Sequence, residues 1–264
     1  MSDVVGLIPA AGRGNRLPGL VGSKEVLPLP ESLRRQGLEV AADCLIWGFG
    51  QAGIRQAVVL VRPGKEDIPE RLGLRRFDVD LVYEEVGETR STVETLAAAR
   101  RRVAGAVVAL GFPDVLLRPA DGFGALLRRL EGGDAMAVLG LYPNDRPERS
   151  DIVELAADGT VREIRVKPVG AKPGLAWMTA VWRPSLTDLM ASHVGREGSH
   201  VRTGAERREL QPGDVLREAL LAGQRLDAVA FPEGASLDIG TPADLARAAT
   251  FDLGVPTPAK AAGS

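Results

Sequence analysis

The sequence predicts an α/β fold built on a doubly wound, mostly parallel sheet, with a more mixed α+β second half. Three observations carry this prediction. Short apolar runs of strand length recur through the first 141 residues, helical patterns separate them, and a hairpin pattern begins only after residue 150. Alternation of strands and helices is typical of parallel sheets that bind ligands at the carboxyl ends of their strands.

The first half of the chain supplies most of the parallel sheet. Five apolar runs predict buried strands: Val4–Ile8, Ala57–Val61, Val79–Tyr83, Ala106–Leu110 and Ala135–Leu141. Three segments between them have helical periodicity: Leu38–Ala52, Thr89–Val103 and Gly122–Leu130. We therefore expect helices on both faces of this sheet.

The second half mixes hairpin and helix signals. Asp158-Gly159 predicts the turn of a hairpin between Ile152–Leu155 and Val161–Val166. A further strand is expected over Leu175–Trp182, followed by helices over Ser185–Ser192, Gly213–Ala222 and Pro242–Thr250. Residues 195–211, dense in Arg, Glu and Gly, predict a mobile surface loop or lid. We expect one domain over residues 1–254 and a disordered tail over 255–264.

The composition indicates a compact soluble protein. The chain has 264 residues, 45% of them hydrophobic, and a net charge of −2, which argues against a protein that coats nucleic acid or a membrane surface. No apolar run is long enough to span a bilayer and no signal peptide is evident, so a cytoplasmic location is expected. The single cysteine, Cys44, lies in an apolar helical stretch and is expected to be buried and structural. Both histidines, His193 and His200, are expected in a solvated polar loop.

The segment from Leu7 to Leu29 predicts a loop that binds phosphate. A buried strand ends in Pro-Ala-Ala-Gly-Arg-Gly, whose small residues let backbone N–H groups approach a ligand. Arg16 and Lys24 add two cations beside it, in a chain where only five of 33 basic residues are lysines. A dinucleotide fingerprint is disfavoured because Leu17 stands at its third glycine, and no G-K-[ST] follows to make a P-loop.

Two aspartates are candidates for a metal site. Asp114 follows the buried strand that ends at Leu110, where a carboxylate could hold Mg²⁺ against a triphosphate. A turn at Pro113-Asp114 is the structural alternative. In the segment after Ser236, Thr241, Pro242 and Asp244 are explained as the capped start of a helix, but Asp238 is not.

These motifs resemble those of the nucleotidylyltransferases, in particular the type that acts on sugar 1-phosphates. The first motif matches at Gly12, Gly14, Arg16, Leu17, Ser23, Lys24, Leu27 and Pro28. The family's D-x-G-T-P-x-D-L segment matches from Asp238 to Leu245, and Lys167-Pro168 matches the end of its E-K-P motif. The resemblance therefore covers motifs near both ends of the chain.

The resemblance implies a Rossmann-like nucleotide-diphospho-sugar transferase fold and a role for each motif residue. The expected halves are a nucleotide-binding half over residues 1–118 and an acceptor-binding half over 119–254. The expected substrates are a nucleoside triphosphate, with dTTP or UTP favoured, and a sugar 1-phosphate; the products are a nucleotide sugar and pyrophosphate. A homo-oligomer is also expected. The implied roles are as follows: Ala11, Gly12 and Gly14 bind the nucleotide, Arg16 and Lys24 the β/γ-phosphates, Asp114 and Asp238 the cofactor Mg²⁺, and Lys167 and Thr179 the acceptor.

Departures from the family pattern leave the substrates open. Val166 replaces the usual glutamate before Lys167, and Ala180 replaces a usual glycine. Arg90-Ser91-Thr92-Val93 is similar to a segment of cytidylyltransferases, although Thr89 or Ser91 as a helix cap explains it equally well. A cytidylyltransferase for a polyol or related phosphate and a catalytically silent nucleotide-binding relative are therefore alternatives.

Overall fold

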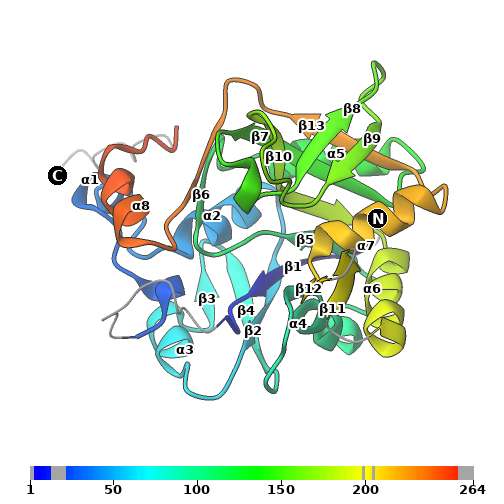
Figure 1. The fold of residues 1–264 in the computed structure, drawn as a ribbon. Coiled ribbons are helices and arrows are strands. Elements are labelled where there is room, and N and C mark those ends of the chain that lie inside the picture. Colours follow the sequence, from blue (N-terminus) through cyan, green and yellow to red (C-terminus); the bar gives the residue numbers. More distant parts are fainter. Residues whose placement is uncertain (1–2, 13–21, 198–199, 204–205, 255–264) are drawn as a thin grey trace, which may run out of the picture.

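The fold is organised around a ten-stranded sheet (Figure 1). A computed structural model describes residues 3–12, 22–197, 200–203 and 206–254, so the predicted tail lies outside the described residues. Along the main path of the sheet the strands are β13 (Leu226–Ala230), β7 (Ala137–Asn144), β10 (Gly174–Trp182), β5 (Val107–Leu110), β1 (Val4–Pro9), β2 (Gln56–Val61), β4 (Val79–Glu85) and β3 (Arg75–Arg76). The predicted hairpin is present as β8 (Ile152–Leu155) and β9 (Val161–Arg165), with β8 paired to β10.

Strand direction divides this sheet into a parallel and a mixed part. β5, β1, β2 and β4 are parallel to one another, as predicted. β10 runs antiparallel between β5 and β7, and so joins the two parts through main-chain hydrogen bonds. The carboxyl ends of the four parallel strands consequently meet at one edge, where ligands bind in folds of this class.

Helices cover both faces of the sheet, which confirms the doubly wound prediction. Along β2 the side chains alternate: Val58 and Leu60 belong to one hydrophobic cluster, and Val59 belongs to another. The first cluster includes residues of α4 (Thr92–Ala98), α6 (Pro184–Glu197) and α7 (Pro212–Leu221). The second includes residues of α2 (Asp43–Gln51), α3 (Asp67–Leu72) and α5 (Phe123–Glu131). The result is a three-layer arrangement.

A third hydrophobic cluster lies beside the main sheet and brings distant segments together. It packs around the two-stranded sheet of β6 (Val115–Arg118) and β14 (Ala235–Asp238), with α1 (Glu31–Arg34), α8 (Pro242–Arg247) and the 3-10 turn η4 (Ala248–Thr250). Leu116 and Leu237 are register partners and both are buried. Cys44 is buried in the same cluster, and burial raises the pKa of its thiol, as expected of a structural cysteine.

Some predicted elements differ in their bounds or type. The helix expected from Leu38 begins at Asp43, because Leu29 N–H donates to Glu39 and Val40 pairs with Pro28, which holds the preceding residues extended. The loop expected over residues 195–211 includes instead the end of α6 and a hairpin of β11 (His200–Thr203) and β12 (Glu206–Glu209). The strands β3, β6 and β13 and the helices α1 and α3 were not predicted from the sequence.

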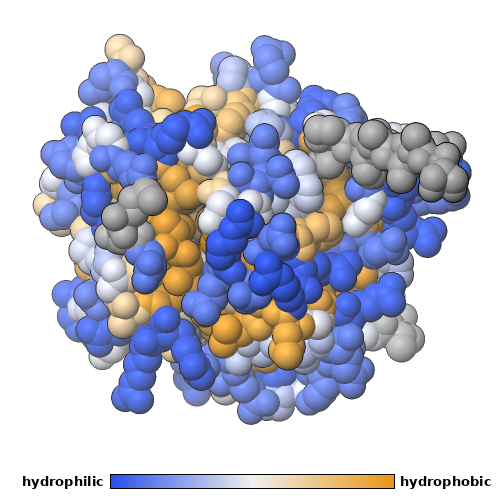
Figure 2. Space-filling view, turned by 180° about the vertical axis from the view of Figure 1, so that it is seen from behind, coloured by the Kyte–Doolittle hydropathy of each residue, from blue (hydrophilic) through white to orange (hydrophobic). Residues whose placement is uncertain are grey.

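The surface is mostly hydrophilic. Figure 2 shows hydrophobic side chains in separate areas, divided by hydrophilic ones. Among the described residues, the large hydrophobic side chains that are well exposed are Leu74, Val169 and Leu221. None of the described helices is long and apolar enough to cross a membrane.

Candidate active site

The predicted phosphate-binding loop lies at the carboxyl end of β1. Ala11 and Gly12 line a cavity of about 570 Å³ at this edge of the sheet. A Cβ atom added to Gly12 would meet no atom of the described residues within 4 Å, so among them the backbone there is open to a ligand. The predicted residues Gly14 and Arg16 lie outside the described residues. The described part of the loop is thus placed where a nucleotide phosphate could reach main-chain groups.

A buried ion pair that the sequence analysis missed holds this loop. Lys65 Nζ lies 2.8 Å from Glu25 Oε2 and donates to Ala10 O at 2.7 Å; the two residues are only 6% and 1% exposed. Burial raises the pKa of Glu25, although Lys65 opposes that shift. The pair therefore ties the end of β1, the 3-10 turn η1 (Lys24–Val26) and the loop after β2 to one another. The rarity of lysine in the chain could have singled out Lys65 from the sequence.

Lys24 and Asp114 form the centre of the site. Their side chains are largely buried, and Lys24 Nζ donates to Asp114 Oδ2 at 2.5 Å. Burial alone would lower the pKa of Lys24, but the charge of Asp114 and this hydrogen bond outweigh burial, so the pKa is raised. Next to Lys24, both Ser23 N–H and Ser23 Oγ donate to Asp67, which anchors the turn. Lys24 is thus a positioned, permanently charged cation at neutral pH.

The structure brings Asp238 to Asp114, although 124 positions separate them in the sequence. Asp238 is the register partner of Val115, and Ile239 N–H donates to Asp114 O at 2.9 Å. Leu237 and Ile239 are buried, so the alternation of β14 leaves Asp238 on the exposed side. Within the described part of the chain, no group of three or more His, Cys, Asp or Glu residues forms a metal-binding cluster. The acidic centre therefore consists of two carboxylates.

Two cavities meet at this centre. The first is the 570 Å³ cavity of the glycine loop, and a second of about 310 Å³ extends toward β7, β10 and α8. Both are lined by the same four residues, Lys24, Thr92, Phe112 and Asp114. Two ligands, one in each cavity, would consequently meet beside Lys24 and Asp114.

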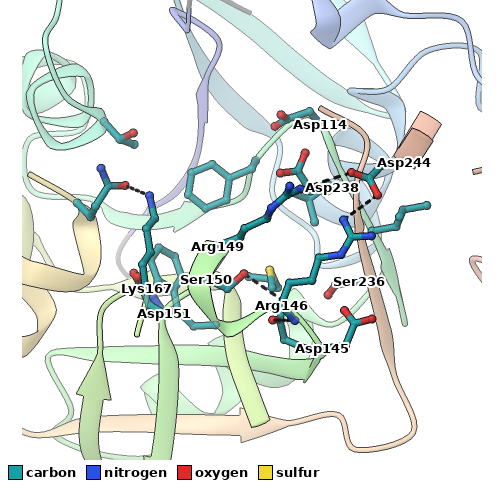
Figure 3. Close-up of a pocket in the computed structure, with 18 of the residues that line it drawn as sticks. Asp114, Asp145, Arg146, Arg149, Ser150, Asp151, Lys167, Ser236, Asp238 and Asp244 are labelled. Carbon is teal, nitrogen blue, oxygen red and sulfur yellow. Dashed lines mark hydrogen bonds and ion pairs between the residues drawn. The ribbon is translucent and has the colours of Figure 1, made fainter. Parts of the chain in front are cut away.

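Lys167, which the resemblance predicts to bind the acceptor, lies in the second cavity. Its Nζ donates to Gln211 Oε1 at 2.8 Å, and Figure 3 draws this contact at one side of the cavity. Trp177 and Met178 of β10 form part of the wall. Thr179, predicted to bind the acceptor, is only 2% exposed and is absent from the described lining; a Cβ atom at Gly140 would lie 2.2 Å from its Oγ1. Thr179 therefore lies behind the part of the cavity wall that Trp177 and Met178 form.

Asp151 is a second functional candidate that the sequence analysis missed. It lines the second cavity, where Figure 3 labels it, and is 7% exposed; its Oδ2 accepts a hydrogen bond from Trp177 Nε1 at 3.1 Å. Its Oδ1 is buried without a hydrogen-bond partner among the described residues. Burial raises the pKa of this carboxyl. Gly213 permits the approach of α7, since a Cβ atom there would lie 2.1 Å from Asp151 Oδ2.

The segment from Thr89 to Thr95 combines a structural and a lining role. Ser91 caps α4, because its Oγ accepts from Glu94 N–H, and this confirms the structural alternative for that residue. Arg90, Ser91 and Thr92 nevertheless line the glycine-loop cavity, together with His200 of β11. The expectation of two solvated histidines was wrong, since His193 is buried in α6 with Nδ1 2.6 Å from Glu218 Oε2.

Comparison with known proteins shows a similarity in fold. No model of a protein family and no curated protein matches the sequence. Solved structures do match it over nearly the whole chain. A Bacillus anthracis protein assigned as a glucose-1-phosphate thymidylyltransferase, solved with sucrose, is 19% identical with a TM-score of 0.78, and the match covers 96% of both chains. The chain has the sugar-1-phosphate nucleotidylyltransferase fold.

Two further structures have the same fold. The UTP-bound UDP-glucose pyrophosphorylase of Acinetobacter baumannii is 18% identical with a TM-score of 0.73, over 93% of this chain and 92% of that one. A UDP-glucose pyrophosphorylase solved with UDP-glucose is 15% identical with a TM-score of 0.72, over 95% of this chain and 98% of that one. The fold implied by the sequence resemblance is therefore confirmed.

Proposed function

We propose that this protein is a Mg²⁺-dependent nucleotidylyltransferase that joins a nucleoside triphosphate to a sugar 1-phosphate and releases pyrophosphate. The observation that carries the proposal is the meeting of two cavities at Lys24 and Asp114. One cavity has the glycine loop that suits a triphosphate, and the other has Lys167 for an acceptor phosphate. The nucleotide-binding half is thus assigned to residues 1–118 and the acceptor-binding half to 119–254.

The geometry supports a direct displacement between two bound phosphates. An oxygen of the acceptor phosphate attacks the α-phosphorus, a new P–O bond forms, and the bond to the bridging oxygen breaks so that pyrophosphate leaves. The nucleophile is already anionic at neutral pH, so no general base is needed. Lys24 would neutralise charge on the pyrophosphate, and Lys167 would orient the acceptor.

The donor set at Asp114 and Asp238 fits Mg²⁺. This ion prefers oxygen ligands and is commonly held by one or two carboxylates together with substrate phosphates and water. The two carboxylates supply the protein ligands, and the bound ion would neutralise phosphate charge. Without the ion, Lys24 is the cation that balances Asp114.

We favour dTTP or UTP as the nucleotide, because the neighbours of the same fold include a thymidylyltransferase and a UTP-bound enzyme. The cytidylyltransferase alternative keeps one supporting observation: Arg90 and Thr92 line the glycine-loop cavity. A panel of nucleotides therefore belongs in the first experiment.

The test is pyrophosphate release from dTTP, UTP, CTP, ATP and GTP, each with a set of sugar 1-phosphates and a polyol phosphate, with and without Mg²⁺. We expect turnover with a pyrimidine nucleotide and a sugar 1-phosphate, and loss of turnover when EDTA removes the metal. Binding of triphosphate without pyrophosphate release from any pair would instead identify a silent nucleotide-binding protein. Turnover confined to CTP and a polyol phosphate would favour the cytidylyltransferase.

A further inference from the structure

Three arginines gather at one end of the acceptor-side cavity. Arg146 and Arg149 come from the segment after β7, which includes the 3-10 turn η3 (Pro147–Arg149), and Arg247 comes from the end of α8. All three surround the buried carboxylate of Asp244. The nitrogen–oxygen distances to it are 2.9 Å from Arg146, 3.3 Å from Arg247 and 3.9 Å from Arg149. We call these three residues the arginine cluster.

Asp244 can satisfy only part of the arginine cluster. Three guanidinium groups carry about fifteen N–H donors, whereas one carboxylate has about four acceptor sites. One of those sites already takes the hydroxyl of Thr241, whose Oγ1 donates to Asp244 Oδ2 at 2.7 Å. The three cations share this one anion as their ion-pair partner, although Asp145 and Asp238 also line the cavity. Asp244 thus positions the cluster without neutralising it.

The arginine cluster is accessible from the cavity. The side chains of Arg146, Arg149 and Arg247 are 39%, 51% and 53% exposed, and all three line the cavity. A guanidinium group binds carboxylate or phosphate through two parallel hydrogen bonds, which a lysine cannot do. The cluster is therefore suited to an oxyanion that enters the cavity.

A second cationic group lies at a different place in the same cavity. Figure 3 places Lys167 at one side and Arg146 at the other, with Ser150 between them. A single phosphate next to Lys167 would leave the arginine cluster without an anionic partner from the ligand. The cavity of about 310 Å³ is at the small end of the range for ligand sites, which suits a phosphorylated monosaccharide.

We infer that the acceptor carries a second anionic group, a carboxylate or a second phosphate, and that Arg146, Arg149 and Arg247 bind it. The inference rests on the proposed function, since it specifies the acceptor of that reaction. The substrate class is then an acidic or doubly phosphorylated sugar 1-phosphate, in place of a neutral hexose 1-phosphate. Both kinds of oxyanion share the same chemistry, and matched acceptors distinguish them.

The test compares glucose 1-phosphate, glucuronic acid 1-phosphate and glucose 1,6-bisphosphate at a saturating concentration of the best nucleotide with Mg²⁺. We expect kcat/KM for at least one of the two doubly anionic acceptors to exceed that for glucose 1-phosphate about tenfold or more. Which of the two is preferred identifies the oxyanion. The variants R146Q, R149Q and R247Q should each lower kcat/KM for that acceptor about tenfold more than they lower it for glucose 1-phosphate. The matched control is R100Q on the far ion pair with Asp188.

Equilibrium binding of the same three acceptors, measured calorimetrically, separates this inference from the proposed reaction. Tighter binding of a doubly anionic acceptor, weakened in the three variants but not in R100Q, supports the inference even if no pyrophosphate is released; only the proposed reaction then fails. Equal or weaker binding and turnover of both doubly anionic acceptors relative to glucose 1-phosphate would overturn the inference. Equal losses for all acceptors in the variants would overturn it as well.

Discussion

The glycine-loop cavity and the acceptor-side cavity share a wall but are built in different ways. The first is lined by the main chain at Ala11 and Gly12 and by the hydroxyl residues at the start of α4, and a buried ion pair fixes its loop. The second is lined by charged side chains from β14 and α8, and from the segments that follow β7 and β9. Both cavities bring distant segments together, but the first presents main-chain and hydroxyl groups of the glycine loop and α4, whereas the second presents mainly charged side chains.

This difference explains where specificity resides. A main-chain cradle binds phosphate in any nucleotide, because N–H groups contact a feature that all triphosphates share. Charged side chains at fixed positions discriminate between acceptors by the number and place of their anionic groups. Variation among related enzymes is therefore expected at Arg146, Arg149 and Asp151, and the reaction itself is expected to depend on Lys24 and Asp114.

The largest expected effect comes from the residue that both cavities share. Asp114→Asn should lower kcat about 1000-fold, about 4 kcal/mol, because it removes the proposed metal ligand and the partner of Lys24. Pyrophosphate release measures the loss, and thermal unfolding checks that the fold survives. The control is Asp188→Asn, an exposed aspartate paired with Arg100. Retained activity in Asp114→Asn with an intact fold would remove Asp114 from the centre of the site.

We expect substitutions beside the glycine-loop cavity to lower the stability of the protein more than substitutions beside the acceptor-side cavity. Lys65→Met leaves the buried Glu25 charge without its partner, and should lower the free energy of unfolding by about 3 kcal/mol in urea denaturation at neutral pH. Adding Glu25→Gln to Lys65→Met should restore part of the loss. The exposed pair of Arg35 and Glu31 offers a matched control in which Arg35→Met changes stability little. A loss no larger than in the control would show that the pair does not fix the loop.

Acid unfolding tests the charge of Asp244, the carboxylate that the arginine cluster surrounds. Burial raises the pKa of Asp244, but hydrogen bonds from Thr241 and Arg146 outweigh that effect and leave the pKa lowered from its usual 3.8. A lowered folded-state pKa contributes stability above pH 3.8 that is lost as the pH falls through the folded-state value. Asp244→Asn should therefore lower the free energy of unfolding by about 2 kcal/mol at pH 7, and the gap should close below pH 3.8. If the difference in free energy of unfolding between the variant and the parent protein did not depend on pH, Asp244 would not be charged in the folded protein.

The smallest effect is expected at Asp151. Asp151→Asn should raise the acceptor KM about tenfold, since Asp151 lines this cavity and its Oδ2 accepts the hydrogen bond that fixes Trp177 in the cavity wall, and should leave the nucleotide KM unchanged. Because the folded-state pKa is raised, the charged carboxylate costs stability above pH 3.8, so the variant should be no less stable at pH 7. Initial-rate kinetics and urea unfolding measure the two effects. Glu154→Gln, on the exposed Arg162 pair, is the control.

Much of the fold could be predicted because its strands are continuous apolar runs. Val4–Ile8 and Ala57–Val61 both lie within observed parallel strands, and Thr241, Pro242 and Asp244 form the capped helix start that was expected. β6 was missed because it is short and pairs only with a distant segment, β14. The hairpin of β11 and β12 was missed because its charged sequence has no apolar period.

The site could be predicted only where a motif is local. Lys24, Asp114, Lys167 and Asp238 were each singled out by a motif, and all four line the acceptor-side cavity, while the roles that the resemblance implies for them stay predictions. Asp151 and Arg146 belong to no motif in the sequence. The contact of Arg146 with Asp244 of α8 forms only in the folded protein and could not be predicted from the loop that contains Arg146. Side chains that acquire a role through tertiary contacts cannot be found by periodicity or spacing.

The pairing of β14 with β6 also sets the order in which the protein can become functional during synthesis. The glycine loop, Lys24 and Asp114 leave the ribosome early, but Asp238 and its pairing with β6 lie near the end of the described chain. A nascent chain that stops before Ala235 has one carboxylate of the pair, and the third hydrophobic cluster lacks Leu237 and Ile239. Translation therefore withholds a complete acidic centre until Asp238 has been made.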